Sequence, residues 1–315
     1  MTKLKALLLT EGMHGMISQV EGMAKALNTE YSHKIVRLSF PWNFTPPKIT
    51  PISNIILKDK IYIDNNETPD LIISCGRKSV IPSIFLKRKN SKIFTIHIQD
   101  PKVNIRNFDA IVAPEHDNLN GDNIYKSKGA IHYITEQEIS NAKEYLADKI
   151  RGEKIVSLIL GGPNKYYSFN SNQIINIFNQ IKSIFVSNGY KVIVIPSMRT
   201  PKEIIDLAIK EMGSFGHVVN KIDKQAYLSA YAIANYVVVT CDSTSMISEA
   251  ATSGKPLFVA HMKTKKNNYR FKRFFELFKQ MGITRELGEK VETWTYNKHN
   301  EAQRIAIEIK NKIMN

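Results

Sequence analysis

The chain has few of the features that mark a secreted, metal-binding or membrane-spanning protein. Only two of its 315 residues are cysteines, and Cys75 and Cys241 lie far apart with no second cysteine near either. This spacing fits neither a zinc site nor a secreted disulfide framework, so we expect both thiols to be reduced. No apolar run approaches the roughly 18–20 residues that cross a bilayer, and the opening stretch soon turns polar. We therefore expect a cytoplasmic protein without a signal peptide or an anchor.

Acidic residues are also scarce. The chain has 29 Asp and Glu against 44 Lys and Arg, a net charge of +15. This excess makes acidic partners such as phosphorylated substrates or anionic lipid electrostatically plausible, although a composition rich in Lys, Asn and Ile raises net charge without a functional cause. No recognised nucleic-acid motif accompanies the charge, so we do not expect nucleic acid as a partner.

What the chain does contain is a repeated pattern of short apolar strands and helix-length segments. In the first half it predicts helices over residues 17–27 and 79–88, and strands over residues 5–9, 34–38, 54–57, 70–74, 92–98 and 109–113. A charged helix is predicted over residues 136–151. The second half continues with predicted helices over residues 171–187, 201–212 and 224–234, and with predicted strands over residues 155–160, 192–195, 217–219, 236–240 and 257–260.

The restart of this pattern after the charged helix predicts two domains, residues 1–150 and 151–315. We expect an α/β protein of two tandem, doubly wound, parallel-sheet (Rossmann-like) domains that face a cleft. The last helix either stays with the second domain or packs back on the first.

Ligands of such sheets bind outside the carboxyl ends of the strands, so the loops there are the candidate sites. Gly12 and Gly15 follow the first strand and precede a helix, and Gly161 and Gly162 occupy the same position in the second half. Each pair allows either close approach of an anion to backbone N–H groups or a plain tight turn. The first pair lacks the G-x-G-x-x-G spacing of a dinucleotide site, and the second is nonspecific as an isolated motif.

Two further loops in the second half carry polar side chains. Arg199 lies at a strand exit, where it would contact a phosphate, remain in solvent or form a salt bridge. Ser243 and Ser245 begin a helix and Glu249 lies one turn further on. Hydroxyl and N–H groups suit a diphosphate and the carboxylate suits ribose hydroxyls, although Ser243 would also serve as a helix cap.

Residues 236–256, with this Ser-rich turn, the helix Glu and the closing Gly-Lys-Pro, resemble the nucleotide-binding signature of GT-B glycosyltransferases. Over most of its length the chain also resembles the mitochondrial fission protein family of plants and its bacterial relatives. The motifs of that resemblance are Asp70–Arg77, Gln99–Pro101, Pro114–Asp117, Gly161–Pro163, Ser197–Pro201 and Asp242–Glu249. The resemblance implies a GT-B-like fold and, for the plant branch, recruitment of a dynamin-related protein. Gln19 is kept from the family's opening motif, whereas His14 replaces its proline.

In this fold the polar loops of the first domain face the cleft, and we assign Gly12, Gly15, Gln19, Arg77 and Gln99 to its acceptor side. A base for sugar transfer is sought among Asp100, His116 and Asp117, which would otherwise only stabilise their loops by hydrogen bonds. Neighbouring residues of one loop rarely chelate one ion, so we expect no metal.

Residues Lys263–Phe278 hold the densest basic cluster, beside Phe271, Phe274, Phe275 and Phe278 on one helical stripe. The stripe either lies on an anionic membrane, which would place the protein peripherally at the inner face of a membrane, or packs on the sheet.

The leading hypothesis is a metal-independent GT-B-type glycosyltransferase that needs no cofactor and takes a nucleoside-diphosphate sugar as substrate. Its alternatives are a nucleotide-sugar epimerase of the same fold and a non-catalytic adaptor on a membrane with a protein partner.

Overall fold

The computed structural model of the protein describes residues 3–62, 68–150 and 154–313. It divides into two compact units, one formed by Met1–Tyr133 with Glu301–Asn315 and the other by Ile134–Asn300. The restart of the strand pattern had suggested a boundary at residue 150. The short helices before that point, α3 (Glu136–Asn141) and α4 (Glu144–Ala147), contact a helix of the second unit and belong to it.

The described part of the first unit contains a parallel sheet of six strands in the order β2-β1-β3-β4-β5-β6. Its helices are α1 (His14–Ala26), α2 (Val80–Lys89) and α10 (Glu301–Ile313). Its strands are β1 (Lys5–Thr10), β2 (Glu30–Ile35), β3 (Leu71–Cys75), β4 (Phe94–Ile98), β5 (Ala110–Pro114) and β6 (Ile124–Ser127).

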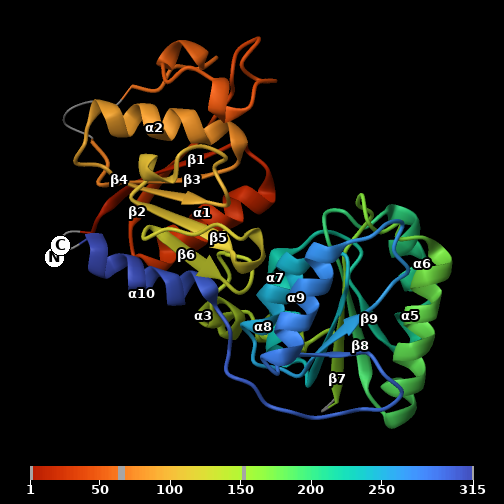
Figure 1. Ribbon diagram of the computed structural model, residues 1–315. Coiled ribbons are helices and arrows are strands. Elements are labelled where there is room, and N and C mark those ends of the chain that lie inside the picture. The colour runs from red at the N-terminus through yellow and green to blue at the C-terminus, as the bar shows by residue number, and fades with distance from the viewer. Residues whose placement is uncertain (1–2, 63–67, 151–153, 314–315) are drawn as a thin grey trace. The chain divides into compact units, whose positions relative to one another are not determined.

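Successive residues of the central strands face opposite sides of this sheet, and each side has its own core. Leu8 belongs to the core under α1 and α10, which also buries Ile305 and Ile309. Leu9 belongs to the core under α2, with Ile81 and Ile84. The unit is therefore doubly wound, and its last helix comes from the far end of the chain (Figure 1).

Six parallel strands in the described residues of the second unit follow the order β12-β11-β10-β7-β8-β9. Its longer helices are α5 (Ser171–Ile184), α6 (Lys202–Met212), α7 (Lys224–Ile233), α8 (Thr244–Ala251) and α9 (Tyr269–Gln280). Its strands are β7 (Ile155–Leu160), β8 (Lys191–Pro196), β9 (Gly216–Val218), β10 (Tyr236–Thr240), β11 (Leu257–Ala260) and β12 (Thr284–Glu286).

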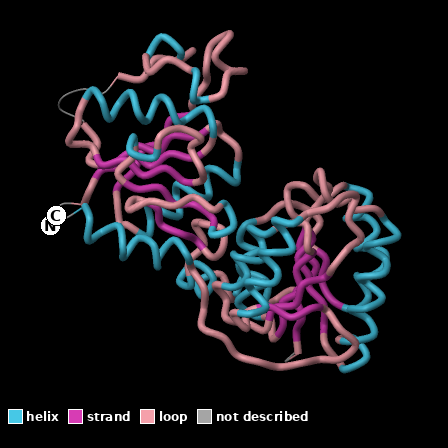
Figure 2. Tube along the Cα trace, viewed as in Figure 1, coloured by secondary structure: helices cyan, strands magenta, loops and turns pink. Residues whose placement is uncertain are grey.

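Within the second unit, α5 and α6 cover one face of the sheet and α7, α8 and α9 the other (Figures 1 and 2). The fold class predicted from the sequence is thus confirmed for both units. Because every strand is parallel, the loops after β7, β8 and β10 leave the sheet at the same edge.

Three local predictions were wrong. The strand predicted over residues 34–38 is β2, which runs from Glu30 to Ile35. It lies at the sheet edge with all six residues exposed, so its sequence lacks the apolar pattern that a buried strand shows. The strand predicted over residues 54–57 is a 3-10 turn capped by Ser53, and only Leu57 bridges to Leu38. The predicted helix over residues 136–151 is broken into α3 and α4.

Candidate functional site

The Gly161–Gly162 turn after β7 is filled by the protein's own atoms. Gly161 N–H donates to Thr240 Oγ1 at 2.8 Å, and Gly162 N–H donates to Asp242 Oδ2 at 2.9 Å. A Cβ on Gly161 would lie 2.1 Å from Asp242 Oδ2, and one on Gly162 would lie 2.0 Å from Arg199 O. The two glycines are therefore required by close approach of neighbouring loops, and both N–H groups are engaged within the fold.

Asp242 joins these loops. Its side chain has no exposed area, and it accepts hydrogen bonds from Thr240 Oγ1 at 2.7 Å, from Gly162 N and from Arg199 Nη2 at 2.9 Å. Burial raises the pKa of this carboxyl, although the hydrogen bonds and the Arg199 charge oppose the shift. The sequence offered one signal for this residue, an acid directly before a hydroxyl-rich turn.

Arg199 lies after β8 and is both fixed and accessible. Its guanidinium donates to Gly162 O at 2.9 Å and pairs with Asp242, yet 40% of the side chain is exposed. Thr200 Oγ1 donates to Leu160 O at 3.0 Å and so ties the Arg199 loop to the end of β7. A held, partly exposed guanidinium of this kind can bind a phosphate without reorganising.

The hydroxyl-rich turn after β10 begins α8. Ser243 caps this helix, because its Oγ accepts from Met246 N at 3.4 Å, whereas Ser245 is exposed. Glu249 is half-buried and accepts a 2.6 Å hydrogen bond from Tyr227 Oη. Burial raises the pKa of Glu249 to about 7, although the Tyr227 bond lowers it. The carboxyl therefore exchanges its proton near neutral pH.

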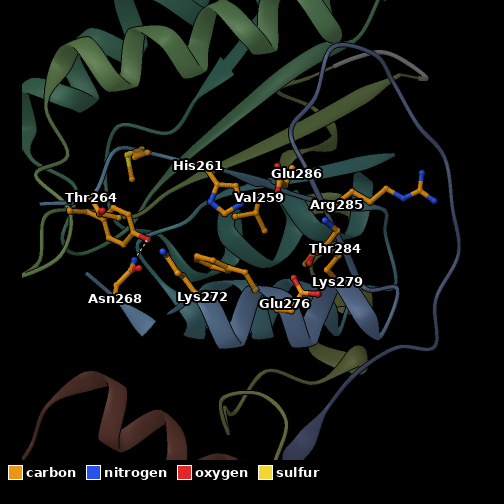
Figure 3. Close-up of a pocket in the computed structure, with 13 residues that line it drawn as sticks. Val259, His261, Thr264, Asn268, Lys272, Glu276, Lys279, Thr284, Arg285 and Glu286 are labelled. Atoms are coloured by element: carbon orange, nitrogen blue, oxygen red, sulfur yellow. Dashed lines mark hydrogen bonds between the residues drawn. The ribbon is translucent and has the colours of Figure 1, made fainter. Parts of the chain in front are cut away.

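A cavity of about 360 Å³ opens beside the exits of β11 and β12, under α9. In Figure 3, Lys272 and Glu276 on α9 face His261 and Glu286 on the sheet side, and a hydrogen bond joins Asn268 to Tyr167. Tyr167 N–H also donates to Asn164 Oδ1, and Asn164 Nδ2 donates to Asp242 O at 2.9 Å. This short chain of contacts links the cavity wall to the Asp242 site.

In the first unit, the loops after β1 and β3 meet through an ion pair. Glu11 Oε1 accepts from Lys78 N at 3.0 Å, and its Oε2 lies 3.3 Å from Lys78 Nζ. Gly76 has a φ of +95°, and a Cβ there would lie 2.7 Å from Met16 Sδ. Gly12 also has a positive φ, +87°, whereas a Cβ on Gly15 would meet nothing within 4 Å. Only Gly12 and Gly76 are demanded by this local geometry.

Gln19 and Gln99 are brought together. Gln99 Nε2 donates to Gln19 Oε1 at 3.3 Å, and Cys75 Sγ lies 3.5 Å from the same oxygen. Gln99 has a φ of +84°, an uncommon conformation for a residue other than glycine and one that clusters at functional sites. Arg77 is instead used inside its unit, since it donates to Asn43 O at 2.6 Å and also to Thr45 O.

The three candidate bases differ in what surrounds them. Asp100 pairs with Lys102 Nζ at 2.5 Å; burial alone would raise its pKa, but the hydrogen bonds from Lys102 outweigh burial and lower it. The negative charge of Asp117 also helps to raise the pKa of Lys102. His116 lies in a 3-10 turn, and its side chain is outside the described part.

Among the residues that the structure describes, no three His, Cys, Asp or Glu side chains are grouped to hold a metal ion. Both cysteines are free and buried. None of the described helices has the length and apolar character needed to span a bilayer.

Comparison with known proteins places this architecture in a class. Two six-stranded parallel sheets with flanking helices match GT-B structures. The UDP-GlcNAc 2-epimerase of Methanocaldococcus jannaschii has a similar fold, with 14% sequence identity, coverage of 98% of this chain and 99% of that one, and a TM-score of 0.51. A Glycyrrhiza uralensis UGT complexed with glycyrrhetinic acid 3-O-monoglucuronide is also similar, with 10% identity, coverage of 98% of this chain and 86% of that one, and a TM-score of 0.51. A third similar structure is a Neisseria meningitidis UDP-GlcNAc 2-epimerase bound to UDP-GlcNAc, with 13% identity, coverage of 98% of this chain and 100% of that one, and a TM-score of 0.50.

The profile of the mitochondrial fission ELM1 family matches residues 14–313, and the chain belongs to that family. The protein RP120 of Rickettsia prowazekii (strain Madrid E) is 27% identical over 91% of this chain and 93% of its own length. The mitochondrial fission protein ELM1 of Arabidopsis thaliana is 23% identical over 78% of this chain and 64% of its own length. The predicted resemblance to the family is confirmed.

Proposed function

We propose that the protein is a metal-independent glycosyltransferase that binds a nucleoside-diphosphate sugar in its second unit. The observation that carries this proposal is the Arg199 guanidinium, which Asp242 and Gly162 O hold at the carboxyl edge of the sheet while 40% of the side chain stays exposed. A fixed cation there would stabilise the charge that develops on a departing diphosphate. The GT-B fold and the nucleotide-sugar ligand of the Neisseria structure support the proposal.

The other donor contacts follow from the same edge of the sheet. Ser245 and the first N–H groups of α8 would bind the diphosphate, next to the capping Ser243, and Glu249 would accept ribose hydroxyls in its ionised form. The Gly161–Gly162 N–H groups are engaged, so we assign the two glycines the role of letting Arg199 and Asp242 approach. The cavity beside Tyr167 has room for a sugar, with Glu276 and Glu286 as acceptors for hydroxyl groups.

We assign the acceptor to the loops of the first unit that carry Gln19, Gln99 and the Glu11–Lys78 pair. The general base is then Asp100, His116 or Asp117. Of the two described carboxylates, Asp100 is held ionised by Lys102, which makes it a weak base, so Asp117 is the first to test.

Turnover with a panel of nucleoside-diphosphate sugars tests the proposal. Release of free nucleoside diphosphate, reduced at least a hundredfold in Asp117→Asn but not in the exposed control Asp122→Asn, would support transfer with Asp117 as base. Formation of an epimerised sugar nucleotide without release of free nucleoside diphosphate would favour the epimerase hypothesis over the transferase. Bound nucleotide that is never turned over would contradict both enzymes.

The second candidate is a non-catalytic adaptor, which the name of the Arabidopsis relative favours. In Lys263–Phe278 the Phe274 and Phe278 rings are buried, so the part of this surface open to a partner is mainly cationic. Neutralising Lys265, Lys266, Arg270 and Arg273 together should then abolish partner binding while turnover, if any, persists.

A further inference from the structure

Exposed large hydrophobic side chains are concentrated in one stretch of the first unit. Among the described residues, fourteen such side chains are at least 40% exposed. Seven of them lie within residues 31–62, a tenth of the chain: Tyr31, Ile35, Phe40, Phe44, Ile49, Ile55 and Tyr62. Single exposed apolar residues need no explanation, but seven on one short segment make that segment a candidate interaction surface.

This stretch, segment 31–62, is displayed on a fixed base. It runs from the edge strand β2 into loops and short 3-10 turns that lie beyond α2, coloured orange in Figure 1 and mostly loop in Figure 2. Val36, Ile56 and Ile61 are buried in the core under α2, and Arg77 holds the carbonyls of Asn43 and Thr45. The hydrophobic side chains are therefore exposed by the fold itself.

The same segment is strongly cationic. It carries five exposed basic residues against one acidic residue, Asp59. The basic residues are Lys34, Arg37, Lys48, Lys58 and Lys60. A second copy of this surface would meet it with charge of the same sign, which opposes self-association through it.

We propose that segment 31–62 docks the first unit on an anionic membrane surface, with aromatic and aliphatic side chains in the interface and cations against lipid phosphates. Phe40, Phe44 and Tyr62 are 82%, 78% and 77% exposed, so each protrudes with little contact to its neighbours. A protein partner would need a matching pocket for each protruding side chain, whereas lipid chains conform around them. Basic residues beside apolar ones are the pattern of interfacial membrane binding.

This surface differs from the basic helix α9. There Phe274 and Phe278 are buried within the second unit, and Phe271 makes edge-to-face contacts with Tyr166 and Tyr167, so Tyr269 is the exposed ring of that helix. Segment 31–62 therefore offers the larger apolar contact. The proposal does not depend on sugar transfer.

Co-sedimentation of the full chain with phosphatidylcholine vesicles, with and without phosphatidylglycerol, tests the inference. We expect binding only to the anionic vesicles, weakened by salt and reduced about tenfold or more in the Phe40→Ser, Phe44→Ser double variant. Tyr269→Ser, which removes a 70% exposed ring from α9, is the matched control and should bind as the wild type does. Loss of vesicle binding in Tyr269→Ser but not in the double variant would place docking on α9 and overturn the proposal.

Fluorescence gives a second, local readout because Trp42 lies within the segment. In a Trp294→Phe background, vesicles of brominated phosphatidylcholine with phosphatidylglycerol should quench Trp42. Absence of quenching while the protein sediments would contradict insertion of this segment. Absence of any vesicle binding would overturn the proposal. A dimer of the wild type that is lost in the double variant would also overturn it, because the surface would then bind a second copy of the chain.

Discussion

At the scale of single residues, the proposed donor site depends on groups that are buried and paired. Arg199 and Ser243 could be found from the sequence because a strand exit and a helix start are visible in the pattern. Asp242 could not be assigned, since its role depends on three loops meeting at one carboxylate. Gly161 and Gly162 could be placed in a turn after a strand from the sequence alone. The sequence does not show whether the N–H groups of that turn bind an external phosphate or, as the structure shows for Gly162, the protein's own carboxylate.

Glu249 should make stability depend on pH. Burial raises its pKa to about 7, above the ordinary value of 4.5, so the folded state binds the proton more tightly than the unfolded state. This contribution is fully present below pH 4.5 and is lost as the pH rises through 7. Relative to Glu249→Gln, the wild type should therefore lose about 2–3 kcal/mol of unfolding free energy between pH 4.5 and pH 8.

Urea denaturation followed by Trp294, which lies in the second unit, measures this difference in a Trp42→Phe background. Tyr227→Phe is the companion variant: it removes a hydrogen bond that lowers the Glu249 pKa, so the midpoint of the pH dependence should rise. A difference between wild type and Glu249→Gln that stays constant across this pH range would show that folding does not raise the pKa of Glu249.

At the scale of elements, the buried central strands β7, β10 and β11 were predicted with the bounds that the structure has. Such strands are continuous apolar runs, which the sequence displays directly. Edge strands were predicted less well: β9 was predicted one residue away, but β6 and β12 were not predicted, because short, half-exposed strands carry little apolar pattern. The break between α3 and α4 was also missed; both short helices pack on α7, a contact between distant segments that the local sequence pattern does not display.

Helix α10 should stabilise the first unit although it is encoded at the other end of the chain. Ile305 is fully buried against α1 and the sheet, whereas Ile307 on the same helix is 66% exposed. Ile305→Ala should cost about 2–5 kcal/mol of unfolding free energy, and the control Ile307→Ala less than about 0.5 kcal/mol.

The two tryptophans separate the units in this experiment. The Ile305→Ala loss should appear in the transition reported by Trp42 and leave the one reported by Trp294 in place. Equal losses from Ile305→Ala and Ile307→Ala, or a loss seen only through Trp294, would refute this role of α10.

At the scale of the whole molecule, fold and family could be predicted because six motifs occur in one order along the chain, and the profile match over residues 14–313 agrees. Function is harder to reach, since one fold serves transferases and epimerases alike. Which residue would serve as the proposed base depends on local pairing, as Asp100 and Lys102 show, and such pairing is not encoded in any motif spacing.

The central claim, a nucleoside-diphosphate site in the second unit, is tested most directly by a thermal-shift screen of the full chain against nucleoside diphosphates and their sugars, read through Trp294. At 100 times its dissociation constant a ligand adds about 2.7 kcal/mol of stability. We predict a shift with one nucleotide that Arg199→Met abolishes and the exposed control Arg106→Met retains. No shift with any nucleotide in folded protein, or a shift that Arg199→Met leaves unchanged, would contradict the claim.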